Sequence, residues 1–476
     1  MVRSVVGPFL ALLATLPIVS GASPEKKLFA STLSSEEHVL PARILGHALH
    51  ELDPTVPFAV FYTEEISGTS LEELEAEGVK TIRVDRVEAP SSSFQIRMWS
   101  HTEYTAIVHI DPDALPLVDV SELFRCGAFC ASFRHSDKFN SGVFVLRPDQ
   151  KVYKDLLSKI GALNSYDGGD QGFLNSYFAE LKLAPIPDQK VYKDLLSKIG
   201  ALNSYDGGDQ GFLNSYFAEL KLAPMFDGNS TQDQTSARLL RLPAEYNFDV
   251  GVYYLEGRML LEPRVLHFTM GLLKPWRWWT LPFLDLSFKW TDIRSSHMTR
   301  HNLPYLTTWQ WIVQLFFFAI PSLLKRYVLH RQGEILKRPT YVGEDYRRLG
   351  LGILGISVVV AFFSTPSHLY HSMAWLLFGL KTLYYDMSLV QAYSIHFIRR
   401  PVTKFEQFKF LLLVVPFSLI LWFLVYAITA PHPRFFIALL GTALWTWLVA
   451  VRNHRQLTYY EYGKREIRYR QVERQD

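Results

Sequence analysis

Cysteine is almost absent from the sequence, which has only Cys126 and Cys130 in 476 residues. So few cysteines exclude a disulfide framework and a cysteine-rich zinc site. The four-residue spacing of the pair allows either a local bridge or two packed thiols one helical turn apart. Of the two, packed thiols are the favoured interpretation.

A strong net charge is also lacking, because the chain as a whole carries only +3. The charges are unevenly placed: residues 303–476 have 20 Lys and Arg against 9 Asp and Glu, and the rest has 29 against 37. The basic residues of the second half are confined to short segments between apolar runs, which suits a membrane surface better than a nucleic-acid-binding face. The length and this asymmetry predict a soluble domain joined to a membrane region, with no nucleic-acid partner.

The amino terminus has the features of a signal peptide, expected at residues 1–22. Arg3 precedes the apolar run Val5–Val19, and residues 20–22 are small. The run is short for a membrane span, and a buried first strand or helix is the alternative. Export would make the sequon that begins at Asn229 usable for glycosylation.

Five apolar runs of about the length of a bilayer-spanning helix follow residue 300. They are Thr307–Leu324, Leu349–Thr365, Ala374–Phe397, Phe410–Thr429 and Phe435–Val451. Every second connection is rich in Lys and Arg, as the positive-inside rule requires. The pattern predicts about five transmembrane helices within residues 301–452, a luminal domain before them and a basic cytosolic tail at 453–476. Five buried helices of a large soluble core are the alternative.

The third apolar run contains two ionisable residues, Lys381 and Asp386. An ionisable residue inside a span is by default a candidate functional site. A mutual pair at positions i and i+5, or a re-entrant segment, remains an equal alternative.

The first half of the chain alternates strand-like and helical segments. The strand-like runs are Lys27–Leu33, Phe58–Tyr62, Thr81–Val84 and Thr105–Ile110, with helical patterns at Ala42–Leu52 and Leu71–Glu77. This alternation predicts an α/β domain with a largely parallel sheet. Asp111 and Asp113 follow a strand, at the edge where such sheets bind ligands. Two carboxylates there suit Mg²⁺ or Mn²⁺, although Asp-Pro-Asp is also a turn sequence.

Four further motifs follow along the chain. They are Phe139–Leu146, expected as a polar turn opening into a strand, then Asp167–Gly172, Leu242–Asn247 and Val265–Trp276. Asp167–Gly172 reads Asp-Gly-Gly-Asp-Gln-Gly, in which the glycines allow close backbone approach to a ligand and the polar side chains supply donors and acceptors. His267, taken alone, is better interpreted as a core histidine.

The order of these motifs resembles the glycogenin-like branch of family 8 retaining glycosyltransferases. The shared motifs are Asp-x-Asp, Asn-Ser-Gly-Val, Asp-Gly-Gly-Asp-Gln-Gly, Leu-Pro-x-x-Tyr-Asn and His-Phe-x-x-Gly-x-x-Lys-Pro-Trp, spread over about Lys27–Leu286. The resemblance implies a GT-A (Rossmann-like) nucleotide-sugar domain, placed at residues 23–300. The Lys-Pro-Trp-x-Trp-Trp sequence at Lys274–Trp279 and the apolar runs look most like the plant inositol phosphorylceramide glucuronosyltransferase group.

The resemblance also implies roles for individual residues. Asp111, Asp113 and His267 would hold Mn²⁺ (or Mg²⁺), Asp170, Gln171 and Lys274 would be catalytic, and Thr32, Leu33, Asn140, Ser141, Gly142, Asp167 and Gly271 would bind the UDP-sugar and the acceptor. A cation and a lysine would neutralise the charge that builds on the departing diphosphate. Pro112 and Gln95 depart from the family pattern and would weaken donor binding, so a catalytically inactive scaffold stays an alternative.

The hexapeptide lies in a block that occurs twice without a difference, at Pro148–Pro185 and Pro187–Pro224. Repeats of a solenoid drift at surface positions and usually number three or more, so this is a recent duplication or a sequence-assembly error. A single site can use only one copy. The first copy is favoured because the insertion then falls in a surface loop. The second copy would supply Asp206, Asp209 and Gln210 instead.

The sequence thus predicts a metal-dependent retaining glycosyltransferase in the Golgi or endoplasmic reticulum membrane. It would move a glucuronosyl or other hexosyl group from a UDP-sugar to a membrane-associated acceptor, an inositol phosphosphingolipid being the favoured one. The alternatives are glycogenin-like transfer to a protein or glucan acceptor, and an inactive scaffold that retains the fold.

Overall fold

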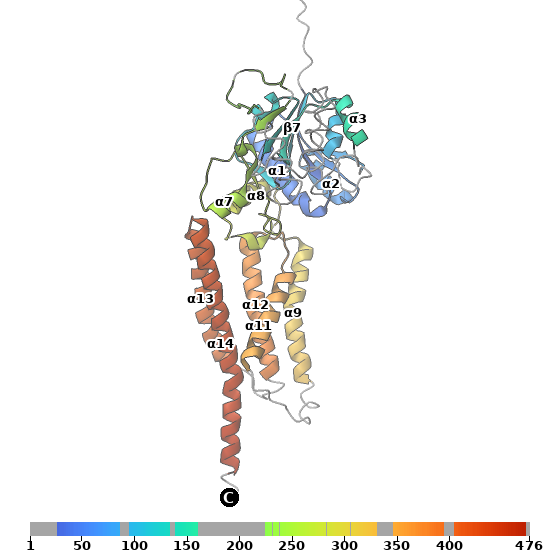
Figure 1. Cartoon of the computed structure of the whole chain (residues 1–476). Helices are drawn as coiled ribbons and strands as arrows, with labels where there is room; N and C mark the ends of the chain where they lie inside the picture. The colour runs from blue at the N-terminus through green and yellow to red at the C-terminus, as the bar shows by residue number, and fades with distance from the viewer. Residues whose placement is uncertain are drawn as a thin grey trace, which may run out of the picture.

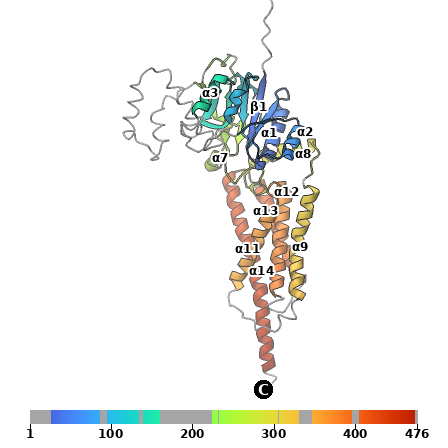
Figure 2. The same cartoon turned by 90° about the vertical axis from the view of Figure 1, so that its right-hand side faces the viewer.

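The computed structural model of the protein describes residues 26–85, 95–133, 139–159, 224–230, 232–237, 239–281, 283–304, 306–330, 346–394 and 404–472. They form an α/β head followed by a column of long helices (Figure 1, Figure 2). This is the order that the charge and hydropathy patterns indicate. The expected signal peptide lies outside the described residues.

The head is built on a seven-stranded sheet of order β3-β2-β1-β4-β7-β6-β8. Its strands are β1 (Lys27–Leu33), β2 (Phe58–Tyr62), β3 (Lys80–Arg83), β4 (Ala106–Ile110), β6 (Phe129–Phe133), β7 (Phe139–Leu146) and β8 (Leu239–Leu242). Strands β1 to β4 pair in parallel, β8 pairs in parallel with β6, and β7 is antiparallel to both of its neighbours. The prediction of an α/β domain with a largely parallel sheet is confirmed, and the four expected strands agree within one residue.

A smaller sheet of order β5-β10-β9 lies next to the carboxyl end of β4. Its strands are β5 (Ala114–Pro116), β9 (Phe248–Asp249) and β10 (Val265–His267). β10 runs antiparallel to β5, with His267 opposite Ala114. Because Ala114 follows Asp113 directly, this pairing carries His267 to the Asp-Pro-Asp turn.

The helices of the head surround the sheets. They are α1 (Val39–Leu52), α2 (Gly68–Ala76), α3 (Gln150–Lys159), α7 (Val250–Glu256) and α8 (Ser287–Arg300), with the 3-10 turns η1 (Glu36–His38), η2 (Gln95–Ser100), η3 (Ser121–Arg125), η5 (Ala244–Asn247) and η6 (Trp278–Thr280). Leu45 and Leu49 of α1 pack in the core of the large sheet, whereas Ile44 packs in the cluster around the small sheet. α1 is therefore buried on two sides and joins the two cores.

β7 corrects one expectation of the sequence. Asn140, Ser141 and Gly142 were expected in a polar turn, but they lie within a strand that is buried along its whole length. The polar side chain of Asn140 is accommodated there because its Oδ1 accepts hydrogen bonds from the Gly142 amide and from Asn247.

The two cysteines are joined by a disulfide, with their Cα atoms 6.5 Å apart. The favoured interpretation of packed thiols is therefore wrong. Nor are the two residues a helical turn apart, because Cys126 follows η3 and Cys130 lies in β6.

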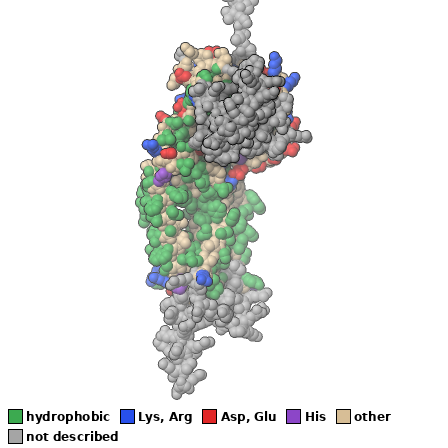
Figure 3. All heavy atoms as spheres, viewed as in Figure 1, with side chains coloured by type: hydrophobic (Ala, Val, Ile, Leu, Met, Phe, Trp, Pro, Cys, Tyr) green, Lys and Arg blue, Asp and Glu red, His purple; other side chains and the backbone are tan. Residues whose placement is uncertain are grey.

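Within the described residues, a helix covers most of each of the five apolar runs: α9 (Thr308–His330), α11 (Tyr346–Ser364), α12 (His371–Tyr393), α13 (Lys404–Ala427) and α14 (Pro431–Val472). Within the described part of the chain, Phe405–Ala427 and Pro431–Leu457 are long and apolar enough to cross a membrane. Hydrophobic side chains cover the visible face of the helical column (Figure 3), and Phe363 is 81% exposed. α14 continues past residue 452, where the last span was expected to end.

Lys381 and Asp386 of α12 do not pair with each other. Lys381 donates to Gln314 of α9 and, over 2.7 Å, to the Ser364 carbonyl of α11. Asp386 accepts from Arg452 (3.1 Å) and from the neighbouring asparagine of α14. Residues five apart on a helix point to different sides, so each of the two buried side chains ties α12 to a different part of the column.

Asp386→Ala is expected to destabilise the protein by about 3–5 kcal/mol, because it leaves Arg452 without its carboxylate at a buried position. The double variant Asp386→Ala/Arg452→Met should lose less stability than the sum of the losses of the two single variants, because the two residues interact. The stability losses of Asp386→Ala and Lys381→Met should add, because these residues do not interact. Thermal unfolding of the three single and two double variants in detergent measures both couplings. Additive losses for Asp386 and Arg452 would contradict the pairing.

Candidate active site

Asp111, Asp113 and His267 meet at the carboxyl end of β4. One possible ligand atom from each lies within 4.8 Å of the other two. His267 Nε2 is 3.3 Å from Asp113 Oδ1 and 4.0 Å from Asp111 Oδ2. The imidazole is buried and the carboxylates are partly exposed, so the group is anchored on one side and accessible on the other.

Asn247, at the end of η5, orients the His267 ring. Its Oδ1 lies 2.8 Å from His267 Nδ1, and its Nδ2 donates to Asn140 Oδ1 over 2.8 Å. Asn140 Oδ1 also accepts the Gly142 amide, so it acts as an acceptor and Asn247 must present its NH₂ to it. Nδ1 of His267 therefore carries a proton, and Nε2, which faces the carboxylates, is the nitrogen that would bind a metal ion.

Gly142 leaves the space that the His267 ring occupies. A Cβ at this position would lie 2.1 Å from His267 Cε1. Any side chain at residue 142 would therefore displace the imidazole. This contact gives a steric reason for the glycine in Asn-Ser-Gly-Val.

Lys274 is held beside the same carboxylates. Its Nζ donates to Asp113 Oδ2 over 2.6 Å and to the Phe268 carbonyl over 2.7 Å. Burial alone would raise the pKa of Asp113, but His267 and Lys274 outweigh burial and hold this pKa well below its usual range. Asp113 is therefore an ionised acceptor at neutral pH.

Thr32 and Leu33 end the neighbouring strand β1 and are both buried. The register pairs Ala30 with His109, so Thr32 falls at the level of Asp111 across the sheet. Ser141 is buried in β7. Gly271 lies in the loop that leads to Lys274, where an added Cβ would meet nothing within 4 Å, so sterics do not require glycine there.

The remaining candidate residues lie outside the described part of the chain. They are Asp167, Asp170 and Gln171 of the first repeat copy and Asp206, Asp209 and Gln210 of the second. Their roles, and the choice between the copies, stay predictions.

The two departures from the family pattern have structural settings. Two backbone hydrogen bonds hold the turn around Pro112, since Asp111 N–H donates to the Gly142 carbonyl and Ala114 N–H donates to the Asp111 carbonyl. The missing amide of Pro112 therefore does not interrupt the turn. Gln95 is buried in η2, and its Oε1 has no hydrogen-bond partner among the described residues.

Sequence reasoning missed two residues of this site. Asn247 is the last residue of Leu-Pro-x-x-Tyr-Asn in the sequence, but its role depends on contacts with His267 of β10 and Asn140 of β7. His109 stacks on Phe144 with ring centroids 4.5 Å apart, and its Nε2 is 3.7 Å from Asp111 Oδ1. Burial lowers the pKa of His109 to about 3, so the ring is neutral at pH 7. Nothing in the sequence separates this histidine from an ordinary strand residue.

The donor set fits a divalent cation. Two carboxylates and one imidazole nitrogen with a fixed tautomer suit Mn²⁺ or Mg²⁺, which complete their coordination with water or with phosphate oxygens of a substrate. The fold and this group together define an α/β protein with a group that could hold a metal ion at the carboxyl edge of its sheet.

Comparison with known proteins narrows this class. Inositol phosphorylceramide glucuronosyltransferase 1 of Arabidopsis thaliana is 28% identical over 290 residues, which are 58% of this chain and 47% of that protein. The putative glucuronosyltransferase PGSIP7 of the same plant is 25% identical over 74% of this chain and 67% of its own length. Rabbit (Oryctolagus cuniculus) glycogenin-1 is 30% identical over 32% of this chain and 50% of its own. The chain thus spans about half the length of the first of these relatives.

These relatives support a glycogenin-like glycosyltransferase of family 8, and the resemblance inferred from the motifs is confirmed. No protein-family model matches the sequence. Among solved structures, the galactosyltransferase LgtC with donor and acceptor sugar analogues aligns over 56% of this chain and 95% of its own. The identity is 14% and the TM-score 0.32, which is too low for that structure to inform the site.

Replacing Asn247 with leucine is expected to weaken Mn²⁺ binding about 10- to 100-fold, because the ring of His267 loses its orienting acceptor. Asn247→Asp is the matched control: it keeps an acceptor for Nδ1–H and should lose less. Titration of the purified protein with Mn²⁺, followed by electron paramagnetic resonance, gives both affinities. If the leucine variant binds Mn²⁺ as tightly as wild type, Asn247 does not set the geometry of the site.

Proposed function

We propose that the chain is a membrane-anchored GT-A glycosyltransferase that transfers a sugar from a UDP-sugar to a membrane-associated acceptor, with retention of configuration. The family resemblance supports the reaction class, and the Asp111, Asp113 and His267 group supports its metal dependence. Residues 23–300 form the catalytic domain in this proposal, and residues 301–452 the membrane region.

Two groups of residues would stabilise the negative charge of the departing diphosphate in different ways. Asp111, Asp113 and His267 would hold Mn²⁺, which supplies positive charge to the diphosphate oxygens. Lys274, already held against Asp113, would donate a second set of charge-assisted hydrogen bonds to the same leaving group. In the favoured first copy, Asp170 and Gln171 would face the transferred sugar and the acceptor.

The short connection between Lys274 and the helical column is the main observation in favour of a membrane-associated acceptor. Trp278, four residues after Lys274, is buried against Trp375 and Phe378 of α12, with ring centroids 4.9 and 5.2 Å away. In addition, Nε2 of His371, at the start of α12, lies 3.0 Å from the carbonyl oxygen of Pro275. Asp113, a proposed metal ligand, is therefore tied through Lys274 to the ends of the apolar helices, where the headgroup of a membrane lipid would lie.

This position favours a lipid acceptor over a soluble protein or glucan. The name of the first relative adds a candidate, because inositol phosphorylceramide combines a sugar-like headgroup with a lipid. We propose an inositol phosphosphingolipid acceptor and a glucuronosyl or other hexosyl donor. Golgi or endoplasmic reticulum membranes would then hold the protein through about five spans, with the head in the lumen and the carboxyl terminus in the cytosol.

Microsomes containing the protein, supplied with Mn²⁺ and a panel of UDP-sugars, should transfer sugar only when an inositol phosphoceramide is added. Asp111→Ala/Asp113→Ala should lower turnover by about 100-fold or more, because the charge on the leaving diphosphate is no longer neutralised. Asp292→Ala, an exposed carboxylate of α8, is the control and should keep full turnover. Unchanged turnover in the double variant would refute the metal site, and turnover with glycogen or protein alone would favour the glycogenin-like alternative.

Asn229 tests the orientation of the head. Its side chain is exposed, and its backbone N–H donates to the Asp227 carboxylate in a turn. If the head is luminal, Asn229 should therefore be glycosylated. Protein from eukaryotic cells should migrate faster after endoglycosidase treatment, and Asn229→Gln should abolish the difference. An unmodified Asn229 in exported protein would count against a luminal head.

A further inference from the structure

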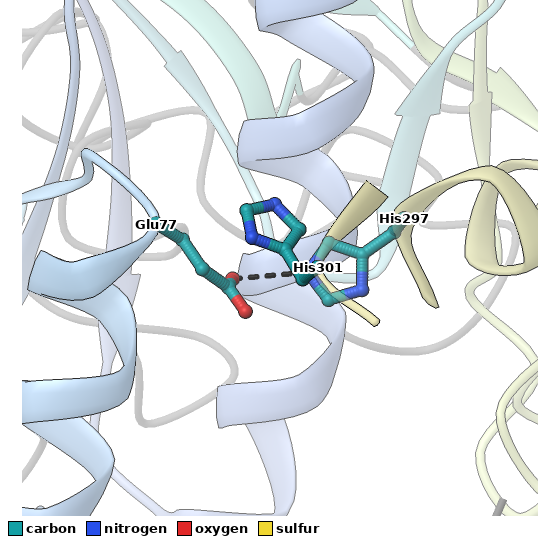
Figure 4. A group of neighbouring side chains, drawn as sticks. All are labelled: Glu77, His297 and His301. Carbon is teal, nitrogen blue, oxygen red and sulfur yellow. Dashed lines mark ion pairs between the residues drawn. The ribbon is translucent and has the colours of Figure 1, made fainter. Parts of the chain in front are cut away.

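A second group of metal-ligating side chains lies where α2 meets α8 and includes none of the active-site residues. It consists of Glu77, His297 and His301, each with a ligand atom within 4.8 Å of the other two (Figure 4). Glu77 caps the carboxyl end of α2, His297 lies in the last turn of α8, and His301 caps that helix. Residues four apart on a helix share one face, so both imidazoles are directed to the same side of α8.

We propose that Glu77, His297 and His301 bind a zinc ion. Two imidazoles and one carboxylate form a ligand set that Zn²⁺ accepts, with its fourth position taken by water. Nitrogen ligands favour Zn²⁺ over Mg²⁺ or Ca²⁺. This site is independent of the Mn²⁺ site in the proposed function.

The distances are close to those of a zinc site. His297 Nε2 lies 3.0 Å from Glu77 Oε2. Two ligands bound tetrahedrally at about 2.0–2.1 Å from zinc lie about 3.3 Å apart. These two atoms need little movement, and the main adjustment falls to His301, which is partly exposed at the helix end.

His297 supplies an independent observation. Its side chain is 1% exposed, and within the described part of the chain neither ring nitrogen has a partner of full hydrogen-bond geometry, although Nε2 makes a 3.0 Å ion-pair contact with Glu77 Oε2. Buried polar groups are normally satisfied, because burying one without a partner costs free energy. A metal ion between His297 and Glu77 would replace their ion-pair contact with a coordinate bond to Nε2.

The charges around the group also accommodate a cation. Arg43 Nε donates to both carboxylate oxygens of Glu77 over 3.0 Å, and the guanidinium also pairs with Glu73. The two carboxylates therefore exceed the single arginine by one negative charge. His47 of α1 lies alongside, with its ring centroid 5.4 Å from that of His297.

A zinc ion here would stiffen the join between the head and the helical column. α8 is the last helix before α9, and its Arg294 donates over 2.7 Å to the His368 carbonyl in the turn between α11 and α12. Tying α8 to α2 through a metal would therefore fix the head over the helix ends without any part in the transfer reaction.

The test uses the full-length protein in detergent, stripped with a chelator, incubated with Zn²⁺ and dialysed, with bound metal measured by mass spectrometry. The Asp111→Ala/Asp113→Ala protein should retain one zinc ion per chain. Adding His297→Gln and His301→Gln to it should remove that ion. His50→Gln, an exposed histidine of α1, is the matched control and should leave the ion in place.

A second readout on the wild-type chain decides the question even if the histidine variant fails to fold. Co²⁺ added to the stripped protein should give the visible absorption of a four-coordinate site, and Zn²⁺ should abolish it. Absence of this absorption, or equal zinc in the proteins with and without the two histidines, would overturn the proposal. His297 and Glu77 would then form a metal-independent ion pair. Neither result depends on sugar transfer, so failure here is distinguishable from failure of the proposed function.

Discussion

The antiparallel pairing of β10 with β5 is the constraint on which the active site depends. It places His267 opposite Ala114 and so beside the carboxylates that follow β4. Asn247 then fixes the tautomer, and Gly142 leaves room for the ring. A small sheet of three short strands thus converts an ordinary sheet edge into a group that can bind a metal.

The same loop that closes the site also attaches it to the helices. Lys274 reaches back to Asp113, while Trp278 is buried among aromatic residues of the helical column. Because so few residues join these two contacts, a shift of the helix ends would be transmitted to Lys274 rather than absorbed by a flexible linker. The position of the proposed membrane surface and the chemistry of the site are therefore mechanically linked.

The parts of the fold that the sequence predicts are those that depend on local pattern. β1, β2 and β4 are short apolar runs with clear ends, and Asp111 and Asp113 follow directly from the end of β4. His267 taken alone is better interpreted as a core histidine, and only the family resemblance predicts it as a metal ligand, because its place in the site comes from pairing with a strand far away in the chain. The partners of Lys381 and Asp386 were equally invisible, since they lie on other helices.

The repeated block can be judged by where its first helix packs. α3 comes from the first copy, and its Tyr153 and Leu156 are buried in the core beside η2. The same ten residues recur at 189–198, but one place in the core can hold them only once. β7 leads directly into the copy that occupies this place, so the first copy begins as an integral part of the domain. This continuity favours Asp167–Gly172 as the functional hexapeptide, which stays a prediction because both copies of the hexapeptide lie outside the described residues.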